Sequence, residues 1–103
     1  MSYDIHYSAP AESDAETIGV YYEKISPGLG LRFFSDIDKL IAALKKNPSA
    51  FHYYKKDKNI RRANLDVFPF GIFFYISENN NSVEVLAIIH NRRSRSFTGK
   101  RLK

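Results

Sequence analysis

The sequence predicts an α+β domain in which a helical hairpin packs on one face of a small, largely antiparallel sheet, in the order β-α-α-β-β-β. Three observations predict this class. Residues 3–8 alternate as a short strand does, residues 10–46 repeat apolar side chains at helical spacing, and residues 60–90 contain three runs rich in strand-forming residues. The length of 103 residues suits a single domain over residues 1–103 with one hydrophobic core.

The first strand is expected to lead into a helix at Pro10, because a proline in the first helical turn loses no hydrogen bond. Ser13 and Glu16 have the spacing of a capping box, which satisfies the free N–H groups of a helix start. The apolar stripe of this helix consists of Ile18, Tyr21, Tyr22 and Ile25. The helix is therefore expected to end near residue 25.

A second helix is expected after Ser26-Pro27, which has the pattern of an N-cap followed by proline at the first helical position. Gly28 and Gly30 weaken that turn and allow a start a few residues later. The wide buried face comprises Phe33, Phe34, Ile37, Leu40, Ile41 and Leu44. The stop is residues 45–48, where two lysines precede an asparagine able to adopt the left-handed conformation and then a proline. So short a turn predicts an antiparallel hairpin.

The second half is expected to form strands at residues 60–67, 70–77 and 82–90, after a basic, aromatic loop at residues 47–58. Pro69 interrupts the ladder between the first two of these strands, and residues 78–81 make a polar turn before the last. The result is a meander that delivers a histidine and several arginines to one end.

Strand alternation assigns side chains to the two faces of this sheet. The apolar set expected beneath the helices is Ala63, Leu65, Val67, Ile72, Phe74, Ile76, Val83, Val85, Ala87 and Ile89. The opposite face is expected to present Arg62, Asn64, Phe73, Tyr75, Glu84, Leu86, Ile88 and His90. Within it Phe73, Tyr75, Leu86 and Ile88 form an apolar strip rimmed by arginines, which predicts a protein-binding groove. The alternative is that the C-terminal segment, through Phe97 and Leu102, covers this strip.

Charge is unevenly distributed. Residues 1–50 hold 5 Lys/Arg and 7 Asp/Glu, whereas residues 51–103 hold 11 Lys/Arg and 4 Asp/Glu. Such a field raises the local concentration of a polyanion or of an acidic protein segment. The residues expected to bind such a partner are Lys55, Lys56, Lys58, Arg61 and Arg95. The ordinary alternative is a solvated rim and a basic tail.

The basic end carries groups that RNA cleavage by the 2′-hydroxyl would need, namely a proton-transfer group and cations around the phosphate. His90 titrates near neutrality, and Arg62, Arg92 and Arg93 suit bidentate contact with phosphate. These four residues are the catalytic candidates if the protein is an endoribonuclease. The ordinary alternative is a structural histidine at a strand end beside solvated arginines.

Other chemistries find little support. The three histidines are widely spaced and form no HxH or HExxH pattern, so no metal and no cofactor is expected. There is no GxSxG, P-loop or GxGxxG motif. The lack of cysteine, of a signal peptide and of a membrane-spanning apolar run predicts a cytoplasmic protein with no membrane partner.

Three segments together resemble the RelE/ParE family of bacterial type II toxin–antitoxin systems. Residues 21–48 are similar to the family's helical hairpin ending in Asn-Pro, residues 60–76 to its stretch of arginine, Phe-Pro and apolar strand, and residues 85–94 to its closing strand with histidine and arginine. The resemblance implies a small growth-inhibiting toxin, of the kind called plasmid stabilisation proteins, held by an antitoxin through an acidic, partly disordered segment. A toxin–antitoxin hetero-oligomer follows from it.

The resemblance leaves two targets, DNA gyrase for members of the ParE kind and mRNA on the ribosome for endoribonucleases of the RelE kind. RelE-like members usually carry an arginine where this chain has Gly71, and a tail tyrosine where it has Phe97 and Thr98. His90 with Arg92 and Arg93 fits the ParE-like pattern better. The predicted function is therefore an antitoxin-neutralised toxin with a gyrase-targeting mode. The alternatives are a metal-independent mRNA endoribonuclease and a non-toxic nucleic-acid-binding module of the same fold.

Overall fold

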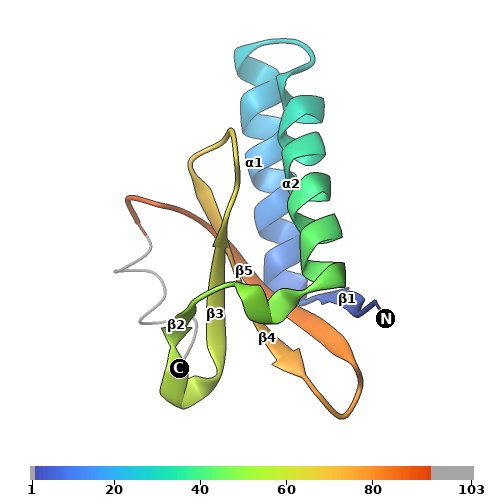
Figure 1. The fold of residues 1–103 in the computed structure, drawn as a ribbon. Coiled ribbons are helices and arrows are strands. Elements are labelled where there is room, and N and C mark those ends of the chain that lie inside the picture. Colours follow the sequence, from blue (N-terminus) through green and yellow to red (C-terminus); the bar gives the residue numbers. More distant parts are fainter. Residues whose placement is uncertain (1, 94–103) are drawn as a thin grey trace.

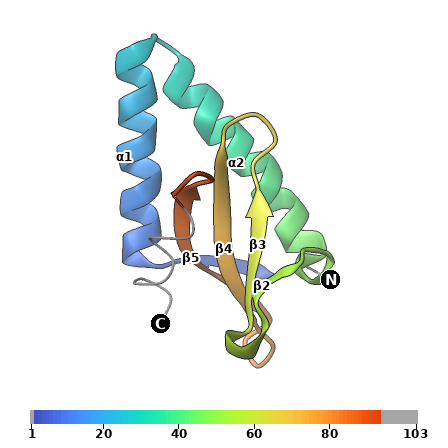
Figure 2. The ribbon, with the colours of Figure 1, turned by 90° about the vertical axis from the view of Figure 1, so that its left-hand side faces the viewer.

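A computed structural model describes residues 2–93 and has the predicted α+β architecture (Figure 1). The elements are β1 (Asp4–Tyr7), α1 (Ala9–Ile25), α2 (Leu29–Lys46), η1 (Pro48–Ala50), β2 (Tyr53–Lys55), η2 (Lys56–Lys58), β3 (Ile60–Asn64), β4 (Phe70–Ser77) and β5 (Ser82–His90). The sheet order is β1-β5-β4-β3-β2, with β1 and β5 parallel and the other pairs antiparallel. Figure 2 shows the strands in front of the hairpin, whose helices meet at one end and diverge toward the other. The short strand β2 lies in the segment that the sequence predicted to be a loop.

Helix α1 begins at Ala9, earlier than the capping-box pattern indicated. Its N-cap is Ser8, whose side-chain oxygen accepts a hydrogen bond from the N–H of Ala11 at 3.1 Å. The same hydroxyl donates to the carbonyl of Leu86 at 3.1 Å, so it also fastens the helix start to β5. Ser13 lies within the helix, and the expected capping box there is wrong. The extended backbone of Ser8, at φ −66° and ψ 159°, provides the cap geometry that a residue inside the helix does not have.

The predicted core-facing stripe of α1 is confirmed for two of its four residues. Ile18 and Tyr22 pack against the main core, whereas Tyr21 and Ile25 are 60% and 58% exposed. The buried stripe instead begins at Ala11, which is fully buried, and runs through positions spaced by three or four residues. The earlier helix start gives α1 an additional turn against the sheet.

The turn between the helices depends on glycine and on one carboxylate. Gly28 caps α2 with φ 90°, in the left-handed region that favours glycine. The carboxylate of Glu23 accepts hydrogen bonds from the N–H of Gly28, at 3.0 and 3.1 Å, and from that of Gly30, at 3.0 Å. Helix α2 therefore starts at Leu29 and not at the proline. It ends at Lys46 as predicted, but Asn47 has φ −154° and is not left-handed.

Strands β4 and β5 contain a β-bulge that the sequence did not reveal. Phe73 pairs with Ala87, and the next residue, Phe74, pairs with Val85. Leu86 is therefore an extra residue on β5 that has no pairing partner on β4. An extra residue of this kind reverses which face every later side chain takes.

The reversal corrects four face assignments. Ala87 and Ile89 were expected beneath the helices, but both belong to a second cluster on the opposite face. Ile88 was expected in the open strip, but it is 3% exposed and part of the main core. His90 follows Ile88 to the helix side, where its ring meets the main-core residue Phe70 edge-on at 5.1 Å between centroids. The prediction that His90 lies opposite the helices is therefore wrong.

The sheet consequently buries side chains on both faces. The main core, between sheet and helices, contains Phe33, Ile37, Leu44, Ile72, Phe74, Val83, Val85 and Ile88 among others. The second cluster comprises Ile60, Phe73, Ala87 and Ile89, with Tyr54 and Leu86 packed against it. Strand β3 ends at Asn64, so Val67 leaves the sheet and is 63% exposed, contrary to its assignment to the apolar face.

Candidate functional site

Arg62 is the centre of the polar groups on the sheet face away from the helices. Its Nε donates to Oδ1 of Asn64 at 3.1 Å, and its Nη2 donates to Oδ1 of Asn91 at 2.6 Å. The guanidinium carbon lies 5.4 Å from the centroid of the Phe73 ring, its cross-strand partner. Two amide oxygens and an aromatic face thus fix the orientation of one half-buried cation. Arg62 lies on the face that strand alternation predicted.

The close neighbour that makes room for this arrangement is Gly71. A Cβ atom added at Gly71 would lie 2.9 Å from Nε of Arg62 and 3.2 Å from Oδ1 of Asn64. Any side chain here would require the Arg62 side chain to shift from its observed position. The glycine that departs from the RelE-like pattern is therefore the residue that lets Arg62 occupy this position.

His90 ends β5 and directs its ring away from that cluster. Its Nδ1 accepts a hydrogen bond from the N–H of Arg92 at 3.1 Å, and its carbonyl accepts one from the N–H of Arg93 at 2.9 Å. With Nδ1 accepting, the neutral ring carries its proton on Nε2. Such a ring can donate a hydrogen bond through Nε2 but cannot take up a proton at that nitrogen without first changing its tautomer.

The turn at residues 90–93 nevertheless reaches Arg62 through Asn91. The N–H of Asn91 donates to the carbonyl of Pro69 at 2.9 Å, which ties the turn to the β3–β4 connection. Arg92 and Arg93 follow on the surface and are exposed. The structure therefore brings this turn beside Arg62, but His90 and Arg62 lie on opposite faces of the sheet.

Arg61, predicted to contact the target, is engaged within the protein. Its guanidinium stacks on the ring of Tyr53 at 3.9 Å, and its Nη1 donates to the carbonyls of Ser49 at 3.2 Å and Phe51 at 2.7 Å. These contacts hold the segment before β2 against β3. Arg61 is thus committed to local structure to a degree that its sequence context did not show.

The basic cluster, which consists of Lys55, Lys56 and Lys58, lies at the same edge of the sheet, on β2 and η2. Lys55 is half-buried at the end of β2, and Lys56 and Lys58 are exposed on η2. Nζ of Lys56 lies 6.0 Å from the Tyr53 ring centroid, at the limit of a cation–π contact. Arg95, together with Phe97 and Leu102, lies outside the described residues.

The predicted apolar strip is smaller than alternation indicated. Phe73 is fully buried in the second cluster, and Ile88 has turned to the helix side. Tyr75 and Leu86 remain half-buried. Only these two of the four predicted groove residues therefore offer side-chain surface on this face.

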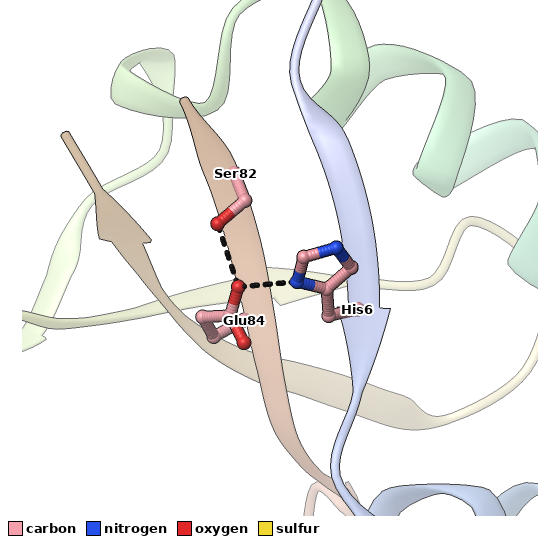
Figure 3. Close-up of polar contacts among 3 residues, drawn as sticks. All are labelled: His6, Ser82 and Glu84. Carbon is pink, nitrogen blue, oxygen red and sulfur yellow. Dashed lines mark hydrogen bonds and ion pairs between the residues drawn. The ribbon is translucent and has the colours of Figure 1, made fainter. Parts of the chain in front are cut away.

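Strand alternation did not predict a polar network on β1 and β5 (Figure 3). Nδ1 of His6 lies 2.8 Å from Oε2 of Glu84, and Oγ of Ser82 donates to the same oxygen at 2.6 Å. The Ser82 hydrogen bond lowers the pKa of Glu84 most, burial opposes it, and His6 lowers the pKa further. The pairing depends on the parallel register that places His6 beside Glu84, two residues far apart in the sequence.

Among residues 2–93, no group of three His, Cys, Asp or Glu side chains is placed to hold a metal ion. Within the same residues, neither helix is long and apolar enough to cross a membrane.

The fold is similar to solved toxin–antitoxin structures. The chromosomal ParDE system of P. aeruginosa matches with TM-score 0.73 at 19% identity, covering 86% of this chain and 96% of that one. The RelBE2 toxin–antitoxin complex of Mycobacterium tuberculosis matches with TM-score 0.63 at 13% identity, covering 87% and 99%. A variant of the E. coli toxin RelE in which two arginines are replaced by alanine, in the free state, matches with TM-score 0.64 at 11% identity, covering 98% and 94%. At these identities the likeness concerns the fold.

No curated protein sequence matches the chain. The family model described as the ParE toxin of type II toxin–antitoxin systems, parDE, matches residues 5–95 and so includes both helices and every strand except the first residue of β1. The chain therefore belongs to the ParE toxin family of type II toxin–antitoxin systems.

Proposed function

We propose that this protein inhibits growth by acting on DNA gyrase, and that a cognate antitoxin neutralises it in a toxin–antitoxin complex. Family membership supports the toxin role, and the gyrase mode is the one that the ParE-like sequence pattern implies. The observation that carries the choice of target is the separation of His90 and Arg62 on opposite faces of the sheet.

That separation weighs against RNA cleavage for a geometric reason. Attack by a 2′-hydroxyl needs a base, an acid and a cation around one phosphate. Nδ1 of His90 is occupied by the N–H of Arg92, so the ring has no free acceptor nitrogen. Arg62 holds amide oxygens on the other face. The two candidate groups therefore do not converge on a single phosphate.

The test compares two reactions with the same purified protein. We expect inhibition of plasmid supercoiling by gyrase and accumulation of cleaved DNA. In translating ribosomes we expect no new mRNA ends by primer extension. Arg92→Ala with Arg93→Ala should reduce gyrase inhibition, whereas Arg32→Ala, an exposed arginine on α2, should leave it unchanged. Ribosome-dependent mRNA cleavage that His90→Ala abolishes would contradict the proposal.

The endoribonuclease remains the second candidate because of one observation. With its proton on Nε2, His90 can donate a hydrogen bond to a phosphate oxygen, and Arg92 and Arg93 lie exposed beside it. In that case the base must come from a residue other than His90. Cleavage that falls in His90→Ala but persists in Arg62→Ala would favour this candidate.

A further inference from the structure

Asp36 is a buried carboxylate of α2 that the proposed function does not use. It is 4% exposed and is the one buried charged residue among residues 2–93. Its Oδ2 accepts hydrogen bonds from the N–H groups of Val67 and Phe68, both at 2.9 Å. A single helix side chain thus holds two consecutive amides of the β3–β4 connection, residues 65–69, which passes in front of α2 in Figure 2.

The cost of burying this carboxylate shows that packing alone does not explain it. Its other oxygen, Oδ1, is buried and accepts no hydrogen bond within residues 2–93. A buried charge that is only half satisfied costs free energy that an apolar side chain would not. The nearby buried positions Phe33 and Ile37 of α2 are apolar. What a carboxylate adds at position 36 is its hold on the two amides.

The same β3–β4 connection holds the turn at residues 90–93. The carbonyl of Pro69 accepts a hydrogen bond from the N–H of Asn91 at 2.9 Å. Phe68, whose amide Asp36 holds, is the residue next to Pro69. The proline ring, and a hydrogen bond of 2.8 Å from the N–H of Phe70 to the carbonyl of Phe68, leave little freedom between these groups. The orientation of the connection at Asp36 therefore determines where the Pro69 carbonyl points.

Aromatic packing holds the side chains of this segment but not the direction of its amides. The buried Phe68 meets the ring of Tyr22 edge-on at 4.8 Å between centroids, and Phe70 meets His90 at 5.1 Å. These contacts keep the segment close to the core. The direction of the two amide groups is set by the Asp36 carboxylate, which is the only one of these contacts that engages them.

We propose that Asp36 is a positioning residue for the turn at residues 90–93. Loss of its two hydrogen bonds lets the β3–β4 connection rotate, releases the N–H of Asn91 and changes where Arg92 and Arg93 point. For activity the inference rests on the proposed action on gyrase, because these two arginines are the expected contacts with the target. For the position of the turn it rests on the hydrogen bonds alone.

The first test measures the turn without any target. Amide hydrogen exchange followed by NMR should be about tenfold faster or more at Asn91 in Asp36→Ala than in the wild type. Glu23→Ala is the matched control, because the Glu23 carboxylate also accepts hydrogen bonds from two backbone amides, at the turn between the helices. With the free energy of unfolding made equal by added urea, Glu23→Ala should leave the exchange at Asn91 unchanged.

Two further variants separate the hydrogen bonds from the space that the side chain fills. Asp36→Asn keeps an oxygen that can accept from both amides, since Oδ2 alone accepts them in the wild type. It should restore most of the slow exchange at Asn91. Asp36→Leu has a similar size but no acceptor, so exchange at Asn91 should stay as fast as in Asp36→Ala.

The second test measures inhibition of gyrase supercoiling. Asp36→Ala should weaken inhibition about tenfold or more, and Asp36→Asn clearly less, because a small misplacement of contacting groups is costly. In a background of Arg92→Ala with Arg93→Ala, Asp36→Ala should cause no further loss, since its effect passes through these arginines. A loss that came from partial unfolding would instead add to the loss from the arginines.

The two tests fail in different ways. Unchanged exchange at Asn91 in Asp36→Ala, or an equal increase in Glu23→Ala, would overturn the inference. An additive loss of gyrase inhibition in the double-arginine background would also overturn it. If the wild-type protein does not inhibit gyrase, the proposed function fails, and the exchange at Asn91 still decides whether Asp36 positions the turn.

Discussion

At the scale of single residues, the position of Arg62 depends on the absence of a side chain at Gly71. The guanidinium lies over Phe73 and donates to two asparagines, and this geometry exists only because no Cβ occupies the space beside Nε. Gly71, which has no side chain, thus determines where the Arg62 guanidinium can lie. The dependence gives a test that does not require the target to be known.

Gly71→Ala is expected to destabilise the protein by about 1–3 kcal/mol, the range for an inserted methyl group in a packed site. The new Cβ would lie 2.9 Å from Nε of Arg62 and force the guanidinium from Asn64 and Asn91. In an Arg62→Ala background the same change should cost clearly less, because the obstructing atom is gone. Urea denaturation of the four proteins measures the coupling. Equal costs in both backgrounds would show that the strain lies elsewhere.

The network of Ser82, Glu84 and His6 predicts a pH dependence (Figure 3). The folded protein holds the pKa of Glu84 below its ordinary value of 4.5, chiefly through Ser82. A depressed carboxyl pKa stabilises the fold above that ordinary value, and the contribution is lost as pH falls through the folded pKa. Glu84→Gln should therefore be less stable than the wild type at pH 6, and the gap should narrow as the pH falls below the ordinary value of 4.5.

Two single variants give the control for that measurement. Because the Ser82 hydrogen bond is the largest single cause that lowers the pKa of Glu84, Ser82→Ala should raise this pKa, and His6→Ala should raise it as well. Side-chain carboxyl titration by NMR reads this value directly. An unchanged Glu84 pKa in Ser82→Ala would mean that the hydroxyl does not hold the carboxylate.

At the scale of secondary structure, an element boundary was predicted correctly when the residues that determine it lie close together in the sequence. The stop at Lys45-Lys46-Asn47-Pro48 and the turn at residues 78–81 were placed correctly because their signals lie within a few residues. The N-cap of α1 was predicted at Ser13 but lies at Ser8, because both serines have side chains that can cap a helix. Ser8 prevails through a tertiary contact with the Leu86 carbonyl that the local sequence does not contain.

The two serines provide the test at this scale. Ser8→Ala should destabilise the protein by about 1–2 kcal/mol, because it removes a helix N-cap and a bond to β5. Ser13→Ala should be neutral or slightly stabilising, since Ser13 is exposed inside the helix, where alanine is the better helix former. Thermal unfolding distinguishes them. A greater loss of stability in Ser13→Ala than in Ser8→Ala would show that Ser13, and not Ser8, is the N-cap.

The candidate site was only partly predictable, for a reason that also belongs to this scale. Alternation placed Arg62 correctly because β3 pairs with β4 in unbroken register. It failed for Ile88 and His90 because one extra residue at Leu86 reverses every later position. It could not find the network of His6 and Glu84, because that contact requires β1 to pair in parallel with β5.

At the scale of the whole molecule, charge divides the surface into two regions. The surface between α1 and α2 carries four carboxylates, from Glu12, Glu16, Glu23 and Asp38, whereas β2, η2 and the turn after β5 are basic. A partner that spans both regions needs opposite charges in its two contacting segments. Long-range attraction at the basic region is screened over about 8–10 Å at ordinary ionic strength, so it should be sensitive to salt.

The last prediction locates that attraction. The cognate antitoxin should bind more weakly as salt rises, by about tenfold or more between low and high salt, because ions screen the pairing of its acidic segment with the lysines of β2 and η2. Replacing Lys55, Lys56 and Lys58 with glutamine should flatten this dependence. Replacing Lys24, Lys39 and Lys46, which are exposed on the helices, removes the same charge from a different place. Since both triple variants have equal net charge, a difference in salt slope, measured by titration calorimetry, must come from location. Equal slopes would show that the antitoxin responds to total charge, and that the basic cluster is a solvated rim.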